Sequence, residues 1–322
     1  MIRKQTSQIL VFIFCLVVVA FTVPLWLQPY YVQSMITALS LGLTAMSLTL
    51  LAGYGGMVSL TQMSFYAMAA YIVGICTHDF GWPTYIVIPL AIIGSVFLSV
   101  IFGIIVIHSE GIYFLMMTLA LSQLFYGLAI NWESVTHGWN GISGIARPSI
   151  FGFSLTQTNP RYYTTLVIII ICYLLLLVII NSPFGLILQG IRDDPKRMSA
   201  LGFNISLYKF LAIVISSVFA GIAGILGVYS TGVVAPSNVS ISSSVLVLMV
   251  AMVGGIYHIE GGLVGAIVIV FLVNFIRQYT SRYWIIIGAI FVLVVILLPN
   301  GILGVNLKAI LSKKRLSLKK IK

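Results

Sequence analysis

The sequence predicts an all-α integral membrane protein, a polytopic bundle of about ten transmembrane helices. Of its 322 residues, 60% are hydrophobic and only 7% are charged, whereas soluble domains carry about 25% charged residues. A soluble globular chain is therefore excluded, and so is a disordered one, because disorder requires low hydrophobicity. The long apolar runs, as at 164–180 and 285–298, are continuous. They lack the alternation of barrel strands and therefore indicate helices.

The hydrophobic stretches predict spans of about 20 residues each. We expect them at 9–27, 33–52, 57–77, 84–107, 111–131, 163–181, 208–230, 243–257, 262–276 and 283–299. Arg3 and Lys4 precede the first apolar run as in a signal peptide, but no clear small-residue cleavage site follows, so we interpret it as an uncleaved helix. The chain is expected to form a single transmembrane domain, 1–322, with a basic tail from about residue 305.

Individual spans differ in character. The stretch at 57–77 is polar at its start, and the spans at 243–257 and 262–276 are short and separated by paired glycines. Spans two to five and seven to ten form two four-helix sets that would run in opposite senses. That geometry is typical of the inverted repeats of many transporters, although no residue-level repeat accompanies it here.

Lysine and arginine in short loops predict the orientation. With the N-terminus inside, the cytoplasmic segments hold thirteen of these residues and the outer loops hold four, and the chain carries a net charge of +11. Both termini are therefore expected in the cytoplasm, where the basic tail would lie near anionic lipid. A nucleic-acid-binding arm is the alternative interpretation of the tail, but no soluble recognition module accompanies it.

The residues that usually carry catalysis or ion coupling are few. None of the six carboxylates lies in the middle of a predicted span, which argues against a proton- or sodium-coupled carrier. The three cysteines have no metal-ligand spacing, and no catalytic or phosphate-binding motif occurs. We expect no enzyme activity, no metal and no cofactor, so any ATP must bind to another subunit.

Polar side chains within two spans are candidates for a translocation pathway. In the first stretch, 53–74, Ser59 and Gln62 would share one helix face, with Thr61 beside them. The second stretch contains Thr118, Ser122 and Gln123. A neutral polar lining suits a weakly held, zwitterionic solute. The alternative is that these side chains only join helices through hydrogen bonds.

A third informative stretch lies in the long inside loop 181–208. Asp194 is a suitable N-cap, Pro195 a favoured first helical residue and Gly202 a suitable terminator of a short helix. Asp193 would complement the positive end of that helix. The helix would present Lys196 and Arg197 to a partner or to lipid headgroups, the alternative being a solvated loop.

Several ordered stretches resemble one known family. They are 53–74, 118–123 with 131–138, 141–148, 190–202, 254–265 and 298–304. Together they are similar to the branched-chain amino-acid ABC-importer permeases, above all to the M-type subunit, which pairs with an H-type subunit. The resemblance implies a type II-like permease of a bacterial or archaeal cytoplasmic (inner) membrane, with an extracytoplasmic solute-binding protein outside and two cytoplasmic ATPase subunits inside.

The resemblance also implies roles for two loops. The inside loop matches the ATPase-coupling segment of the family, although Met198-Ser199-Ala200 departs from its Glu-Ala-Ala run. The coupling residues would be Arg192, Asp193, Asp194, Pro195, Lys196, Ala200 and Gly202. The outer loop would dock the binding protein through Trp139, Asn140, Gly141, Gly144 and Arg147.

The expected function is that of an ATP-driven permease for branched-chain amino acids. Related permeases of this kind carry urea, short amides or aromatic acids, so these solutes stay open as alternatives. A secondary carrier or channel that works without ATPase subunits is the alternative of another class.

Overall fold

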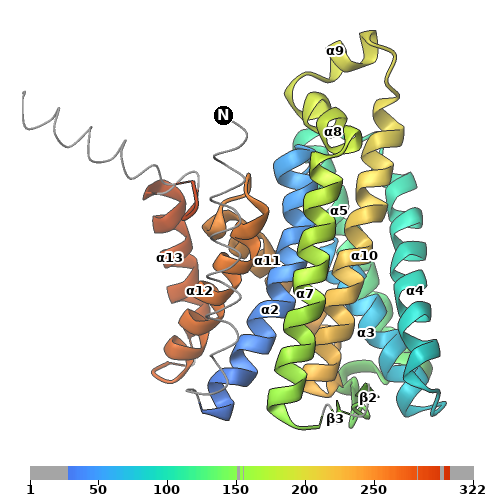
Figure 1. The fold of residues 1–322 in the computed structure, drawn as a ribbon, viewed down its shortest axis with the longest axis vertical. Coiled ribbons are helices and arrows are strands. Elements are labelled where there is room, and N and C mark those ends of the chain that lie inside the picture. Colours follow the sequence, from blue (N-terminus) through green and yellow to red (C-terminus); the bar gives the residue numbers. More distant parts are fainter. Residues whose placement is uncertain (1–27, 151–152, 155, 281, 298–300, 305–322) are drawn as a thin grey trace, which may run out of the picture.

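The computed structural model describes residues 28–150, 153–154, 156–280, 282–297 and 301–304. The predicted first span at 9–27 and the basic tail from 305 lie outside the described residues. The rest forms an all-α bundle whose main helices run between two opposite ends (Figure 1). They are α2 (Pro29–Thr49), α3 (Gln62–His78), α4 (Thr84–Val106), α5 (Gly111–Asn131), α7 (Thr158–Asn181), α10 (Ile205–Thr231), α11 (Ile241–Gly254), α12 (Ile259–Arg277) and α13 (Tyr283–Leu297).

Six described helices are long and apolar enough to cross a membrane: α2 with its extension, α4, α5, α7, α10 and α12. The apolar helices α11 and α13 are shorter, at 14 and 15 residues. The protein is therefore a multi-pass membrane protein built from helices. A total of ten spans and an inverted repeat stay predictions.

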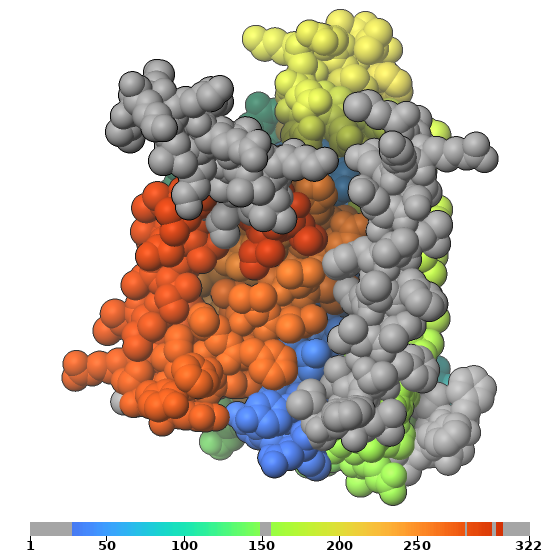
Figure 2. Space-filling view, turned by 60° about the vertical axis from the view of Figure 1, so that its left-hand side comes forward, coloured from blue at the N-terminus to red at the C-terminus, as the bar shows by residue number. Residues whose placement is uncertain are grey.

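The two ends of the bundle carry different short elements. At one end, here the α9 end, α8 (Pro183–Asp193) and α9 (Pro195–Ala200) project beyond the long helices (Figures 1 and 2). The strand end holds α6 (Glu133–Thr136), the 3-10 helix η2 (Gly138–Asn140) and the strands, and a second 3-10 helix, η3 (Pro236–Val239), follows the last strand. The strands are β1 (Ile142–Ser143), paired antiparallel with β4 (Val233–Val234), and β2 (Ser149–Ile150), paired antiparallel with β3 (Phe153–Ser154).

Helices α2, α3 and α10 form the centre of the bundle. The most apolar window of α2 and its extension is 83% buried, against 28% for α4, which places α2 inside and α4 at the periphery. Small residues bring the central helices together. A side chain at Gly224 or Gly227 of α10 would collide with Tyr66 of α3, and one at Gly42 of α2 would meet Leu263 of α12.

Two sequence expectations are corrected here. Residues 57–61 are not helical, so Ser59 and Gln62 do not share a helix face. The Ser59 hydroxyl accepts a hydrogen bond from the Thr61 amide, and the Leu60 amide donates to Thr118 Oγ1. These contacts hold the backbone outside the helix. The expected loop 181–208 also contains the 11-residue helix α8, which begins at Pro183.

A π-helix, η1 (Leu50–Tyr54), prolongs α2 at the α9 end. The glycines in this stretch allow two other segments to approach closely. A side chain at Gly53 would collide with the carbonyl of Ile256, and one at Gly56 would meet Arg192.

Candidate functional site: a hydroxyl-lined cavity and its two ends

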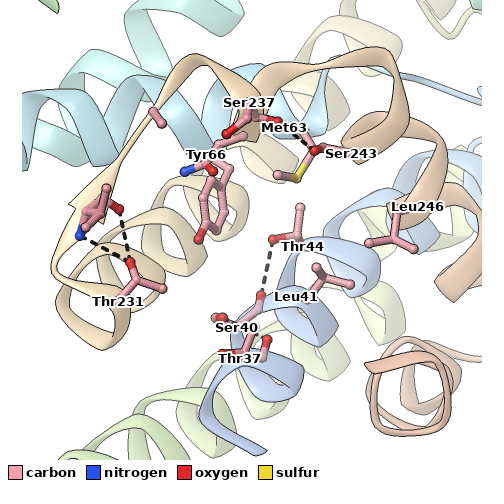
Figure 3. A pocket seen from close by; sticks show the side chains of 13 residues that line it. Thr37, Ser40, Leu41, Thr44, Met63, Tyr66, Thr231, Ser237, Ser243 and Leu246 are labelled. Carbon is pink, nitrogen blue, oxygen red and sulfur yellow. Dashed lines mark hydrogen bonds between the residues drawn. The ribbon is translucent and has the colours of Figure 1, made fainter. Parts of the chain in front are cut away.

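The centre of the bundle contains a cavity of about 340 Å³, here the hydroxyl cavity (Figure 3). Its walls come from α2, α3, the end of α10 and the segment from β4 to α11. The lining residues are Thr37, Ser40, Leu41, Thr44, Met63, Tyr66, Thr231, Val233, Ala235, Ser237, Asn238, Ser243 and Leu246. None of them is charged. The cavity therefore suits a solute that needs no charged side chain as its partner at this depth.

Several hydroxyl groups of the cavity already donate hydrogen bonds to backbone carbonyls. Thr44 Oγ1 donates to the carbonyl of Ser40 (3.2 Å), Ser40 Oγ to that of Thr37 (3.0 Å) and Ser243 Oγ to that of Ser237 (2.8 Å). Each oxygen keeps lone pairs, which makes the lining rich in acceptors. A ligand that donates hydrogen bonds, such as an ammonium group, matches it, and Leu41, Met63 and Leu246 add apolar contacts.

A buried polar layer lies next to the cavity on the side of the α9 end. Gln62 Oε1 accepts from Ser47 Oγ (2.9 Å), and Gln62 Nε2 donates to Ser216 Oγ (3.4 Å). Gln62 thus joins α2, α3 and α10 one residue away from Met63 in the cavity wall. Its side chain is 2% exposed, so the three helices are closed against each other at this level.

The other predicted pathway residues are also placed inside the bundle and do not line the hydroxyl cavity. Ser59 and Thr61 hydrogen-bond each other (2.8 Å), and Thr118 receives the amide of Leu60. Ser122 joins Ser64 of α3 and Ser244 of α11 at 3.2 and 3.5 Å. Gln123 is partly buried, and its Nε2 has no hydrogen-bond partner among the described residues. A pathway role for these residues stays a prediction.

Sequence reasoning missed the residues of α2 that line the cavity. Thr37, Ser40 and Thr44 follow each other at spacings of three and four residues, which puts them on one helix face. That regular ladder of small hydroxyl residues in an apolar span was the signal available. The sequence gives no comparable signal that β4 and η3 line the cavity, because this depends on how the chain folds back toward the cavity between α10 and α11.

The segment at the α9 end has the local structure that the sequence predicts. Asp194 Oδ1 accepts from the Arg197 amide (3.1 Å) as the N-cap of α9, Pro195 is its first residue, and Gly202 follows it with φ +89°. Lys196 and Ala200 are exposed. Arg192 pairs with Asp193 at 2.8 Å and reaches back to the bundle.

The predicted docking residues lie at the strand end. Trp139 is 72% exposed, and Asn140 and Gly144 are also exposed, whereas Gly141 is buried beside β4. The loop is tied to α3 through Asp79, whose carboxylate lies 2.7 Å from His78 and 3.5 Å from His137. The hydrogen bond with His78 holds the pKa of Asp79 below its ordinary value.

The described residues contain no group of three or more His, Cys, Asp and Glu that could hold a metal ion.

Comparison with known proteins identifies the family. Residues 30–297 match the family model described as the permease component of the branched-chain amino acid transport system. The chain belongs to this family. The match covers α2 to α13 and thus includes the hydroxyl cavity, the strand end and the α8–α9 segment.

Individual relatives are distant in sequence. The high-affinity branched-chain amino acid transport system permease protein LivM of Salmonella typhimurium is 24% identical over 80% of this chain, and LivM of Escherichia coli 25% over the same share. The matched stretch spans 66% of the length of these LivM proteins. LivH of Escherichia coli is 24% identical over 85% of this chain and 96% of its own length. No solved structure matches significantly.

Proposed function

We propose that this chain is the transmembrane permease subunit of an ATP-driven ABC importer for branched-chain amino acids. It would form the pathway with a second, H-type permease. An extracytoplasmic binding protein would deliver the solute, and two cytoplasmic ATPase subunits would supply the energy. The observation that carries this proposal is the uncharged, acceptor-rich cavity inside a member of the branched-chain amino acid permease family.

The chemistry of the cavity fits an apolar amino acid. Hydroxyl oxygens accept from the ammonium group, and Leu41, Met63, Val233 and Leu246 contact an aliphatic side chain. Such contacts do not distinguish similar solutes strongly, because one methylene contributes only about 1–3 kcal/mol even in a good pocket. Selectivity among leucine, isoleucine and valine is therefore assigned mainly to the binding protein.

The proposed orientation places the α9 end in the cytoplasm and the strand end outside, in a bacterial or archaeal inner membrane, with both termini cytoplasmic. The thirteen-to-four distribution of lysine and arginine supports it. In this orientation the hydroxyl cavity lies toward the outside, and the Gln62 layer closes the path from the cavity to the cytoplasm.

The mechanism that we propose is alternating access. A loaded binding protein docks on the outer loop around Trp139, and closure of the ATPase pair moves α8 and α9. That motion would reach α2 and open the polar layer formed by Ser47, Gln62 and Ser216, which is held by two hydrogen bonds between two hydroxyls and one side-chain amide. The predicted residues Ser59, Thr61, Thr118, Ser122 and Gln123 lie in or beside this region of the bundle.

The test is ATPase activity and uptake by the full complex in proteoliposomes, screened with amino acids, amides, urea and aromatic acids. We expect leucine, isoleucine or valine with the binding protein to stimulate hydrolysis and uptake together. Stimulation by urea or amides alone would reassign the substrate. Uptake that persists without ATP or without the ATPase subunits would refute the importer and indicate a carrier or channel.

A further inference from the structure

A second cavity, here the mouth cavity, opens at the strand end and measures about 380 Å³. It is lined by Gly144, Ile145, Arg147, Thr156, Thr231, Gly232 and Val233. Thr231 and Val233 also line the hydroxyl cavity, so the two cavities adjoin across the end of α10. A solute that reaches the hydroxyl cavity from the strand end passes this arginine-bearing wall.

The guanidinium of Arg147 lacks a partner within the described part of the chain. Its Nε is buried without a hydrogen bond, and no ion pair joins it to a carboxylate. All six carboxylates of the chain are described, and five of them bind elsewhere: Asp79 to histidines, Asp193, Asp194 and Glu110 to basic residues, and Glu260 to Tyr173. The sixth, Glu133, is exposed and pairs with no arginine.

A second arginine adds positive charge beside the mouth cavity. Arg161 is 6% exposed and donates from Nη1 to the carbonyl of Ser230 at 2.8 Å. This bond satisfies the carboxyl end of α10, where the helix carries partial negative charge. Arg147 and Arg161 lie close enough to repel each other. Arg161 therefore pairs with the end of α10, whereas the positive charge of Arg147 has no such partner among the described residues.

A partly buried cation without a partner is costly, and an anion that pairs with it recovers much of that cost. A guanidinium offers a planar fork of donors that matches a carboxylate. We propose that Arg147 binds the carboxylate of the incoming solute in the mouth cavity, and that the ammonium and apolar side chain then pass into the hydroxyl cavity. This site rests on the proposed function and restricts the solute to carboxylate-bearing molecules, which excludes urea and simple amides.

The site is tested by solute binding to the purified complex of permeases and ATPases without binding protein. Thermal unfolding is followed with increasing L-leucine, L-leucinamide or isoamylamine, of which only leucine has a carboxylate. We expect leucine to raise the unfolding temperature of the wild type and the other two to be much weaker. Arg147→Gln should lower the apparent leucine affinity about tenfold or more, and Arg147→Lys should retain part of it.

Arg282→Gln is the matched control, because Arg282 is an exposed arginine at the same end that lines neither cavity. Leucine titrations of this variant should match those of the wild type. A second arm measures docking of the binding protein to each variant. If Arg147→Gln weakens docking but leaves leucine binding intact, the carboxylate belongs to the docking protein and the solute site is refuted.

Other outcomes also decide the question. Equal stabilisation by leucine and leucinamide, or no stabilisation of the wild type by leucine, would overturn the site. ATP-dependent leucine uptake by the wild-type complex tests the proposed function separately. Wild-type uptake together with unchanged leucine affinity in Arg147→Gln and Arg147→Lys would refute the site alone, whereas absent wild-type uptake would refute the proposed function and the ligand assigned here.

Discussion

Arg192 Nη1 donates a hydrogen bond of 2.6 Å to the carbonyl oxygen of Gly53. This bond joins α8 to the π-helix η1, which prolongs α2 at the α9 end; α2 itself lines the hydroxyl cavity farther along. The guanidinium also lies 5.7 Å from the ring centre of Tyr257, and the Arg192 stem packs against Gly56. A π-helix leaves the regular hydrogen-bond ladder and often marks a functional position. A movement of α8 can therefore act on α2 directly, through the bond between Arg192 and Gly53.

We predict that Arg192→Gln separates ATP hydrolysis from uptake. The substitution removes a charged hydrogen bond to a carbonyl, an interaction typically worth about 1.5–3 kcal/mol. Hydrolysis by the full complex should persist, while leucine uptake per ATP should fall about tenfold. Arg282→Gln removes the same charge far from α8 and should leave the ratio unchanged. An unchanged ratio in Arg192→Gln would contradict the contact as the route of coupling.

The structure also shows which features local sequence can predict. The cap at Asp194, the start at Pro195 and the turn at Gly202 were predictable because each depends on neighbouring residues. The start of α3 at Gln62 instead of at residue 57 was missed, because its cause includes a contact between Leu60 and Thr118, 58 residues apart. The hydroxyl cavity was missed for the same reason, since its walls come from segments about 200 residues apart.

Asp194 allows the cap and the charge of the coupling segment to be separated. Asp194→Ala removes the acceptor of the Arg197 amide and should destabilise α9 by about 1 kcal/mol. Asp194→Asn loses the charge but keeps a good cap. We expect the alanine variant to bind the ATPase subunits more weakly and the asparagine variant to resemble the wild type in co-purification and stimulated hydrolysis.

Reversal of both carboxylates, Asp193→Lys with Asp194→Lys, removes cap and charge together and should uncouple hydrolysis from uptake. Equal defects in Asp194→Ala and Asp194→Asn would show that charge, rather than the cap, matters at this position. Unchanged uptake in the double reversal would refute the coupling role predicted for this segment.

Gln62 is predicted to close the translocation path next to the hydroxyl cavity. Gln62→Leu keeps a similar size but loses the bonds to Ser47 and Ser216, which leaves both hydroxyls without this partner. Hydrogen bonds between membrane helices average about 0.6 kcal/mol, so the unfolding temperature should fall only slightly. The larger effect should be ATP-independent efflux of leucine from preloaded proteoliposomes.

A matched control is Thr77→Val, because Thr77 lies in the same helix and donates only to backbone carbonyls of that helix. It should not increase efflux. Tight proteoliposomes and normal uptake with Gln62→Leu would show that the layer is helix-to-helix contact alone and has no gating role.

Gly141 is predicted to determine the shape of the outer loop. Its φ is +62°, and a side chain there would collide with the Val234 carbonyl and lie 2.8 Å from the Ala235 Cα. Gly141→Ala should therefore disrupt the pairing of β1 with β4 in addition to a backbone strain of about 1–3 kcal/mol, because φ +62° with ψ −169° is essentially confined to glycine. Gly81→Ala also changes a glycine with positive φ, at +61°, but with open space around it. We expect Gly141→Ala to weaken docking of the binding protein several-fold while ATPase activity without binding protein persists. Similar docking by the two variants would indicate that the contact with β4 does not shape the docking surface.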